Sequence, residues 1–178
     1  WHREPKQRFQ MIENCNIGLD YIQKDMGIKL VGIGGIDIVD KSVKLTLGML
    51  WSVISKFHLD KIIGEHKSSG QSSRDALLQW CQKNTAGYQN VNVQDFSKSW
   101  SSGCAFCALI NKFVPDILDY NSLDLSNQSQ CVNAALDTSR ELGLNVYLEP
   151  SDLIGVAEPD EKAIITQAAE LYQYLTDA

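Results

Sequence analysis

The sequence predicts an all-α protein built from two related helical domains, and three observations carry this prediction. Apolar residues recur at helical spacing in several segments, no segment alternates as a strand does, and one helical pattern occurs twice along the chain. An apolar fraction of 44% beside 21% charged residues is ordinary for a globular protein.

The first helix is expected over 9–26, after a polar, basic opening at 1–8 that is expected to be a loop. One face of this helix carries the side chains predicted to point inward, namely Met11, Cys15, Leu19 and Ile22. Gly27 is placed to end the helix, and the connector at 28–40 is expected to contain a short helical turn near Ile36–Val39.

The most apolar helix is expected over Val43–Phe57. Its main stripe consists of Val43, Leu47, Leu50, Ile54 and Phe57, which share one face. Of these, Leu50, Ile54 and Phe57 are expected to face the core. Other apolar residues lie off this stripe, namely Leu45, Met49, Trp51 and Val53. A helix that is apolar nearly all round needs neighbours on more than one side, so it is either the centre of a core or offers apolar surface to a partner. It is too short and too often interrupted by polar residues to span a bilayer.

The helical pattern continues to Ile63, where Gly64 is expected to end it, and 66–71 are expected to form a flexible linker. Ser72 and Asp75 have the spacing of a capping box, which predicts a helix from there to about Asn84.

Three more helices are expected in the second half of the chain. They cover Cys104–Phe113, Asn127–Leu142 with Gly143 as its stop, and a final helix with Pro159 at its first position. The stripe of the final helix consists of Ile164, Ala168, Leu171 and Leu175.

An internal repeat relates 14–57 to 130–175, because both read helix, connector with an Asp, helix. Asp37 pairs with Asp152 in this alignment. The helices expected at 72–84 and 104–113 have no counterpart in the first copy. We therefore expect the second half of one domain at 1–59, a linker at 60–71 and a complete domain at 72–178.

The charge is distributed unevenly. The chain carries a net charge of −6, which argues against non-specific nucleic-acid binding. Residues 1–71 hold ten Lys and Arg against eight Asp and Glu, whereas 72–178 hold six against fourteen. If the partner is acidic, the first segment is expected to make most of the contact.

No pattern predicts catalysis, a cofactor or a metal site. Gly32-Ile33-Gly34-Gly35 resembles the start of a dinucleotide fingerprint, but the third glycine falls at Asp37 and no βα units follow. Cys104 and Cys107 lie in an apolar helix without a second ligand pair, which predicts buried thiols. The odd number of cysteines and the absence of a signal-peptide pattern favour a cytoplasmic protein.

Particular motifs resemble a known family. Leu19-Asp20, Asp37-Ile38-Val39-Asp40 and Lys44-Leu45-Thr46-Leu47-Gly48-Met49-Leu50-Trp51 resemble the second half of the first calponin-homology domain of an α-actinin- or filamin-type tandem. Leu77-Leu78-Gln79-Trp80-Cys81, Phe106-Cys107-Ala108-Leu109-Ile110 and Pro159-Asp160-Glu161-Lys162-Ala163-Ile164 resemble the second domain of the same tandem.

The resemblance implies an F-actin-binding module of a cytoskeletal cross-linking protein, not an enzyme, in which the first domain makes most of the contact. The residues expected to bind actin are Arg3, Lys6, Arg8, Lys41, Lys44, Leu47, Met49, Leu50 and Ser52. Trp51 is expected to pack against Lys162 of the second domain, a contact on the order of 0.5–2 kcal/mol that would hold the two domains closed. Any dimerisation is expected to come from regions outside this sequence.

Two alternatives remain open at this stage. One is weak binding to phosphoinositides or a membrane surface through Lys83, Lys98 and Lys112, a thin basic patch on an acidic domain. The other is binding to microtubules or signalling partners, which other proteins of the family bind.

Overall fold

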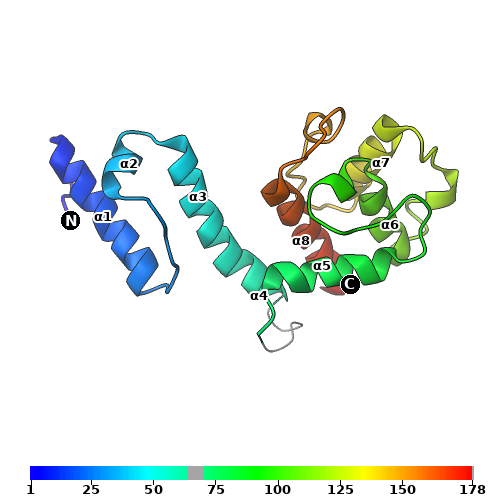
Figure 1. Cartoon of the computed structure of the whole chain (residues 1–178), viewed down its shortest axis with the longest axis horizontal. Coiled ribbons are helices and arrows are strands. Elements are labelled where there is room, and N and C mark those ends of the chain that lie inside the picture. The colour runs from blue at the N-terminus through cyan, green and yellow to red at the C-terminus, as the bar shows by residue number, and fades with distance from the viewer. Residues whose placement is uncertain (64–69, 178) are drawn as a thin grey trace. The chain divides into compact units, whose positions relative to one another are not determined.

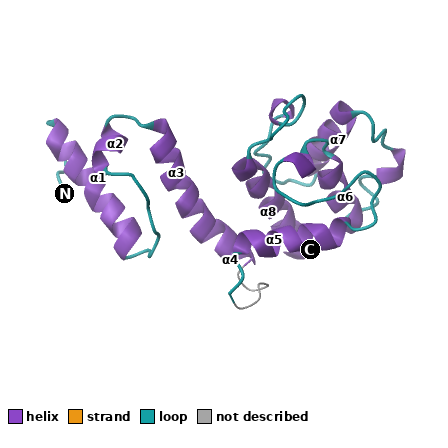
Figure 2. Cartoon of the chain, viewed as in Figure 1, coloured by secondary structure: helices purple, strands orange, loops and turns teal. Residues whose placement is uncertain are grey.

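The computed structural model describes residues 1–63 and 70–177, and all regular elements in these two ranges are helices (Figure 2). The predicted all-α class is confirmed. The contacts divide the chain into two compact units, Trp1–Lys61 and Ile62–Ala178, called here the N-terminal and C-terminal units. The expected end of the central helix at Gly64 and residues 64–69 of the expected linker lie outside the described residues.

The N-terminal unit contains α1 (Arg8–Lys24), the short α2 (Gly35–Val39) and α3 (Val43–Ile54) (Figure 1). A π-helical turn, η1 (Ser55–Leu59), follows α3, and α4 (Asp60–Ile63) follows η1. The helical run therefore reaches Ile63, as the pattern predicted.

Glycine allows α1 and α2 to approach closely. The backbone N–H of Gly35 donates to Asn16 Oδ1 at 2.7 Å, and a Cβ placed on Gly35 would lie 2.5 Å from the carbonyl oxygen of Ile12. No side chain fits in that space, so the glycine-rich segment serves helix packing. This contact explains a motif that resembled the start of a dinucleotide fingerprint.

The inward face predicted for α1 is only partly correct. Leu19 is buried, whereas Cys15 and Ile22 are half-buried and Met11 is exposed. The periodicity of α1 identified its apolar face, but in this unit there are too few neighbouring side chains to cover that face completely.

The C-terminal unit contains α5 (Ser73–Thr85), α6 (Cys104–Phe113), α7 (Gln128–Glu141) and α8 (Glu161–Asp177) (Figure 1). Three short 3₁₀ turns lie between them, namely η3 (Lys98–Trp100), η4 (Tyr120–Ser122) and η5 (Pro150–Asp152). The predicted bounds of α6 are confirmed at both ends, and the Ser72 cap of α5 is confirmed because Ser72 Oγ accepts from the N–H of Asp75 at 3.1 Å.

The core of this unit lies around α6, whose residues from Cys104 to Ile110 are all buried. Trp100 is fully buried against Phe106, with ring centroids 4.5 Å apart, and its indole N–H donates to the carbonyl oxygen of Asp95. The predicted stripe of α8 is confirmed as buried. The start of α8 differs from the prediction, because Asp160 Oδ1 accepts from the N–H of Ala163 and Asp160 thus acts as the cap, after Pro159.

Candidate functional site

The apolar stripe of α3 is the largest departure from what the sequence predicted. The five side chains of this stripe are all exposed: Val43 is 68% exposed, Leu47 57%, Leu50 46%, Ile54 41% and Phe57 47%. The residues off this stripe, Leu45, Met49, Trp51 and Val53, are half-buried. The expectation that Leu50, Ile54 and Phe57 are buried was therefore wrong. Helical spacing shows which residues share a face, but not whether that face meets protein or solvent.

Two lysines lie at the beginning of this open stripe. Lys41 and Lys44 are both exposed, and Lys41 adopts a left-handed backbone conformation, with φ of 60°, in the turn between α2 and α3. The combination of apolar side chains with a cationic edge is suited to a partner that offers an apolar patch bordered by acidic groups.

Two other residues of α3 expected in the site are less accessible. Met49 is half-buried, and the half-buried Ser52 donates its hydroxyl to the carbonyl oxygen of Gly48 at 3.0 Å. The Ser52 hydroxyl is thus bonded to its own helix. Of the three apolar residues expected to bind actin, Leu47 and Leu50 are exposed and Met49 is half-buried.

The basic opening of the chain is held against α1. The backbone N–H of His2 donates to Asn14 Oδ1 at 2.7 Å, and Asn14 Nδ2 donates back to the His2 carbonyl oxygen at 2.8 Å. Arg3 and Lys6 are exposed and form no ion pair with the described residues. Arg8 donates to both carboxylate oxygens of Asp40, at 2.6 and 2.7 Å, so part of its charge is compensated locally.

Trp51 is half-buried and lines a shallow cleft of the N-terminal unit. The cleft has a volume of about 340 Å³ and is lined by the segment after α1, including Lys29, and by the end of the α3 run, including Lys56. Lys56 forms an ion pair with Asp60 at 3.4 Å. Lys162, the expected partner of Trp51, is exposed in the first turn of α8 in the other unit.

The three lysines of the alternative lipid patch do not form one cluster of unpaired cations. Lys98 forms an ion pair with Glu158 at 2.7 Å, and this hydrogen bond raises the pKa of Lys98 and lowers the pKa of Glu158. Lys83 and Lys112 are exposed in the last turns of α5 and α6, where Trp80 stacks on Phe113 at 5.6 Å. The ion pair was not visible from sequence because its partners are far apart along the chain.

Burial keeps three thiols of the C-terminal unit, Cys81, Cys107 and Cys131, in the protonated form. Cys81, Cys104, Cys107 and Cys131 are buried and free. Burial raises the pKa of Cys81 and Cys107, and raises that of Cys131 to about 12, so these thiols stay protonated at neutral pH. Across 1–63 and 70–177 no group of three His, Cys, Asp or Glu side chains is arranged to hold a metal ion. No helix in the described ranges is long and apolar enough to cross a membrane.

Known proteins resemble this chain over nearly its whole length. Alpha-actinin-like protein 1 of Schizosaccharomyces pombe is 41% identical over 174 residues, which cover 97% of this chain and 27% of that protein. Alpha-actinin-1 of Homo sapiens is also 41% identical over 174 residues, with 97% of this chain and 19% of that protein covered. The chain therefore spans well under half the length of these relatives.

Among solved structures, the actin-crosslinking core of Schizosaccharomyces pombe fimbrin matches with a TM-score of 0.77 and 26% identity. The match covers 96% of this chain and 36% of that one. The calponin homology (CH) domain family matches residues 1–59 and again residues 71–177. With two such regions in its sequence and helices throughout both, the chain belongs to the calponin homology domain family.

Proposed function

We propose that this chain is an F-actin-binding module of a cytoskeletal cross-linking protein and that its N-terminal unit makes most of the contact. The proposal is supported by the 41% identity to α-actinins across 97% of the chain and by the resemblance to a fimbrin actin-crosslinking core. The observation that carries it is the open stripe of α3 beside Lys41 and Lys44, in the more basic part of the chain.

In this proposal, Leu47 and Leu50 pack on an apolar patch of the filament, and Lys41 and Lys44 border that contact. Arg3 and Lys6 contribute from the opening loop, and Arg8 does so while bonded to Asp40. Buried apolar side chains at the centre of an interface supply most of the binding energy, whereas exposed charges mainly affect the association rate and its salt dependence.

Co-sedimentation with F-actin tests this contact. The double substitution Leu47→Ser and Leu50→Ser is expected to weaken binding at least tenfold, because two apolar contacts are lost. The matched control is Ile117→Ser, since Ile117 is as exposed as Leu50, at 46%, but lies in the C-terminal unit. The thermal midpoint of each variant separates a lost contact from a lost fold. Unchanged binding by the folded double variant would contradict the proposed surface.

The C-terminal unit is proposed to regulate binding through a closed and an open state, with Trp51 against Lys162 in the closed one. A cation over an indole ring contributes on the order of 0.5–2 kcal/mol, so its loss shifts the population toward the open state. Lys162→Glu is therefore expected to raise actin affinity several-fold. If Lys162→Glu sediments with actin no more strongly than the original chain, the proposed regulation is wrong. That result would leave the proposed filament contact unaffected.

The lipid alternative rests on Lys83 and Lys112 beside the Trp80–Phe113 stack, since Lys98 is paired with Glu158. Two surface lysines contribute only about 1 kcal/mol each near an anionic membrane. Weak flotation with phosphoinositide vesicles, lost in Lys83→Glu, is expected. Strong flotation at physiological salt would favour lipid binding over actin binding as the main function of the chain.

A further inference from the structure

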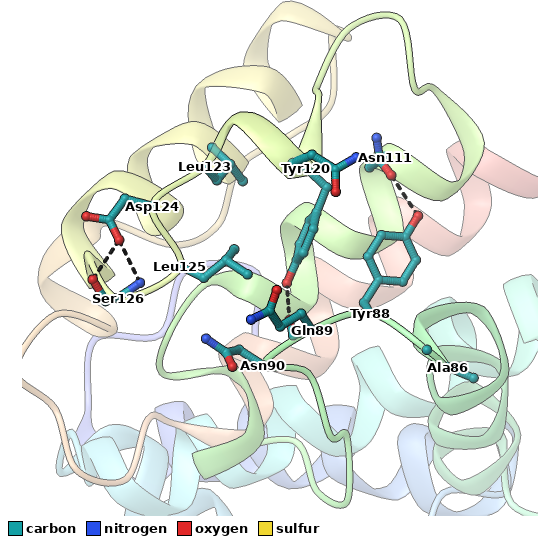
Figure 3. Close-up of a pocket in the computed structure, with 12 residues that line it drawn as sticks. Ala86, Tyr88, Gln89, Asn90, Asn111, Tyr120, Leu123, Asp124, Leu125 and Ser126 are labelled. Atoms are coloured by element: carbon teal, nitrogen blue, oxygen red, sulfur yellow. Dashed lines mark hydrogen bonds between the residues drawn. The ribbon is translucent and has the colours of Figure 1, made fainter.

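The floor of a cavity in the C-terminal unit is formed by tyrosines whose hydroxyls already have partners. The cavity has a volume of about 700 Å³ and is bordered by the loop after α5, by Asn111 of α6, by η4 and by the loop before α7 (Figure 3). The Tyr88 hydroxyl donates to Asn111 Oδ1 and the Tyr120 hydroxyl donates to the carbonyl oxygen of Gln89, both at 2.7 Å. These bonds hold the loops in place on α6. The basic end of the N-terminal unit differs, because part of its donor capacity is unused.

An ion pair in the N-terminal unit joins two segments that are far apart in the sequence. One terminal nitrogen of the Arg8 guanidinium, Nη2, donates to both carboxylate oxygens of Asp40, at 2.6 and 2.7 Å. Arg8 begins α1, and Asp40 directly follows α2. The Arg8 side chain is 56% exposed and the Asp40 side chain 52%. An ion pair this exposed contributes little to the free energy of unfolding, so its main effect is on where the two side chains lie.

The basic opening loop is anchored at the same end of α1. The backbone N–H groups of Lys6 and Gln7 donate to Gln10 Oε1, at 2.9 and 3.1 Å. The starts of α1 and α3 and the short α2 lie at one end of the N-terminal unit, at the top in Figure 1. The pair of Arg8 and Asp40 therefore fastens the end of the opening loop to the turn between α2 and α3.

The turn between α2 and α3 holds a lysine in a backbone conformation that suits glycine. The N–H of Lys41 donates to the carbonyl oxygen of Ile38 at 3.0 Å, and the N–H of Ser42 donates to that of Asp37 at 2.8 Å. These two bonds form a Schellman motif, whose left-handed residue is usually glycine. Lys41 occupies that position with φ of 60°, where its β-carbon is crowded. Strained residues are concentrated at functional sites, which points to a use for the Lys41 charge.

These two features bring cations together at the start of the open stripe of α3. Lys41 directly follows Asp40, and the exposed Val43 and Lys44 come next but one. Asp40 takes up only Nη2 of Arg8, so Nε and Nη1 of Arg8 have no partner in 1–63 and 70–177. Both nitrogens remain available to a carboxylate of a partner.

We propose that Asp40 is a positioning residue of the actin contact. It holds Arg8 at the turn between α2 and α3, so that Arg8, Lys41 and Lys44 border the apolar stripe as one fixed cationic edge. This inference rests on the proposed function. Side chains that are held in place before binding lose less conformational freedom when a partner docks, which favours the complex. The carboxylate thus assists binding to an acidic partner, although its own charge opposes that binding.

The substitution Asp40→Asn separates positioning from net charge, because the two predict opposite results. It removes a negative charge, so long-range attraction alone would strengthen binding to an acidic partner. Positioning instead predicts about fivefold weaker co-sedimentation with F-actin. Asp40→Glu keeps a carboxylate for Arg8 and is expected to bind as the original chain does. Unchanged or tighter binding by Asp40→Asn, or an equal loss in Asp40→Glu, would overturn the proposal.

The matched control is Asp20→Asn, because Asp20 is also exposed and forms an ion pair, with Lys24 at 2.8 Å. It removes the same charge from the same unit and is expected not to weaken binding. The double variant Arg8→Gln, Asp40→Asn is expected to bind as Arg8→Gln does, since Asp40 acts through Arg8. An equal loss in Asp20→Asn, or additive losses in the double variant, would refute the positioning role.

Thermal unfolding separates a lost contact from a lost fold. The midpoint of Asp40→Asn is expected to stay within about 2 °C of that of the original chain, because the ion pair is exposed. Lys41→Gly relieves the crowded conformation, so its midpoint is expected not to fall while its actin binding weakens about threefold. A large fall in either midpoint would attribute the weaker binding to unfolding and contradict the proposal. Full binding by the double variant Leu47→Ser and Leu50→Ser would refute the proposed function, whereas full binding by Asp40→Asn alone would refute only this inference.

Discussion

Helix α3 of the N-terminal unit and helix α8 of the C-terminal unit have similar patterns but opposite surroundings. When Lys44 is aligned with Lys162, the exposed Leu47, Leu50, Ile54 and Phe57 fall on Ile165, Ala168, Tyr172 and Leu175, which are all buried. In the C-terminal unit, α5 and α6 pack on α8, for example through Trp80 and Tyr172 with ring centroids 5.0 Å apart. Residues 1–61 contain no counterpart of α5 and α6.

The difference shows that the same helical pattern can be buried in a core or exposed at a surface, depending on which helices pack against it. Among the described residues, twelve large apolar side chains are exposed in the N-terminal unit and three in the C-terminal unit, although the N-terminal unit is the smaller. A large exposed apolar surface is typical of interaction sites, which is in line with the proposed contact. Any partner that binds α3 is expected to contact the face of α3 that corresponds to the face of α8 covered by α5 and α6.

The largest effect is expected from the same substitution at two aligned positions. Ala168→Asp places a carboxylate in the core of the C-terminal unit and is expected to cost more than about 3 kcal/mol of unfolding free energy. Leu50→Asp, at the aligned position of α3, is expected to cost less than about 1 kcal/mol because the side chain is exposed. Urea unfolding followed by circular dichroism measures both. A cost for Leu50→Asp similar to that of Ala168→Asp would mean that the stripe is covered in the folded protein.

Substitutions at two glycines of the N-terminal unit compare a closely packed position, Gly35, with an open one, Gly48. Gly35→Ala is expected to cost about 1–3 kcal/mol, because its Cβ would meet the backbone of α1. Gly48→Ala is expected to stabilise α3 by about 0.5–1 kcal/mol, since nothing lies within 4 Å of the added carbon. Thermal unfolding of the two variants measures both. Destabilisation by Gly48→Ala would reveal a neighbour against α3.

The helix caps give a smaller contrast between the units. Ser72→Ala is expected to cost about 1 kcal/mol, because the Ser72 hydroxyl accepts from the N–H of Asp75 at the start of α5. Ser42→Ala, at the start of α3, is expected to cost only a few tenths, since the Ser42 side chain makes no capping bond. Equal costs in denaturant unfolding would contradict this difference.

The smallest effect concerns pH. Burial raises the pKa of Asp95, but hydrogen bonds from the N–H groups of Ser99 and Ser97 outweigh it, and the net pKa lies below the usual 3.8. A lowered pKa in the folded state stabilises the protein above pH 3.8, and this stabilisation is lost as the pH falls through the lowered value. The original chain is expected to lose more stability than Asp95→Asn on acidification from pH 5 to 2. Parallel curves for the two proteins would exclude this contribution.

The sequence predicted best where local pattern and tertiary packing agree. The bounds of α6 were correct because the apolar run Cys104–Ile110 lies between Gly103 and Pro115, and the stripe of α8 was correct because neighbours cover it. The expectation that Leu50, Ile54 and Phe57 are buried was wrong, because the periodicity of a helix carries no information about what packs against it.

The candidate site could be predicted less well than the fold, because long-range pairing decides which charges are available. Arg8 bonds to Asp40 and Lys98 to Glu158, and neither pairing follows from spacing. The cavity floored by Tyr88 and Tyr120 was also missed, since its walls come from four segments that are separate in sequence. The only local signal was a cluster of carboxamides and tyrosines around Gln89.

The distribution of the thiols has a practical consequence. Cys15 is half-buried in the N-terminal unit, and the four other cysteines are all buried in the C-terminal unit. A reagent that alkylates thiols therefore reaches Cys15 first and the others only when their unit opens. Mass spectrometry of peptides from one alkylated sample would measure how fast the thiols of each unit become accessible, without adding a label site by mutation.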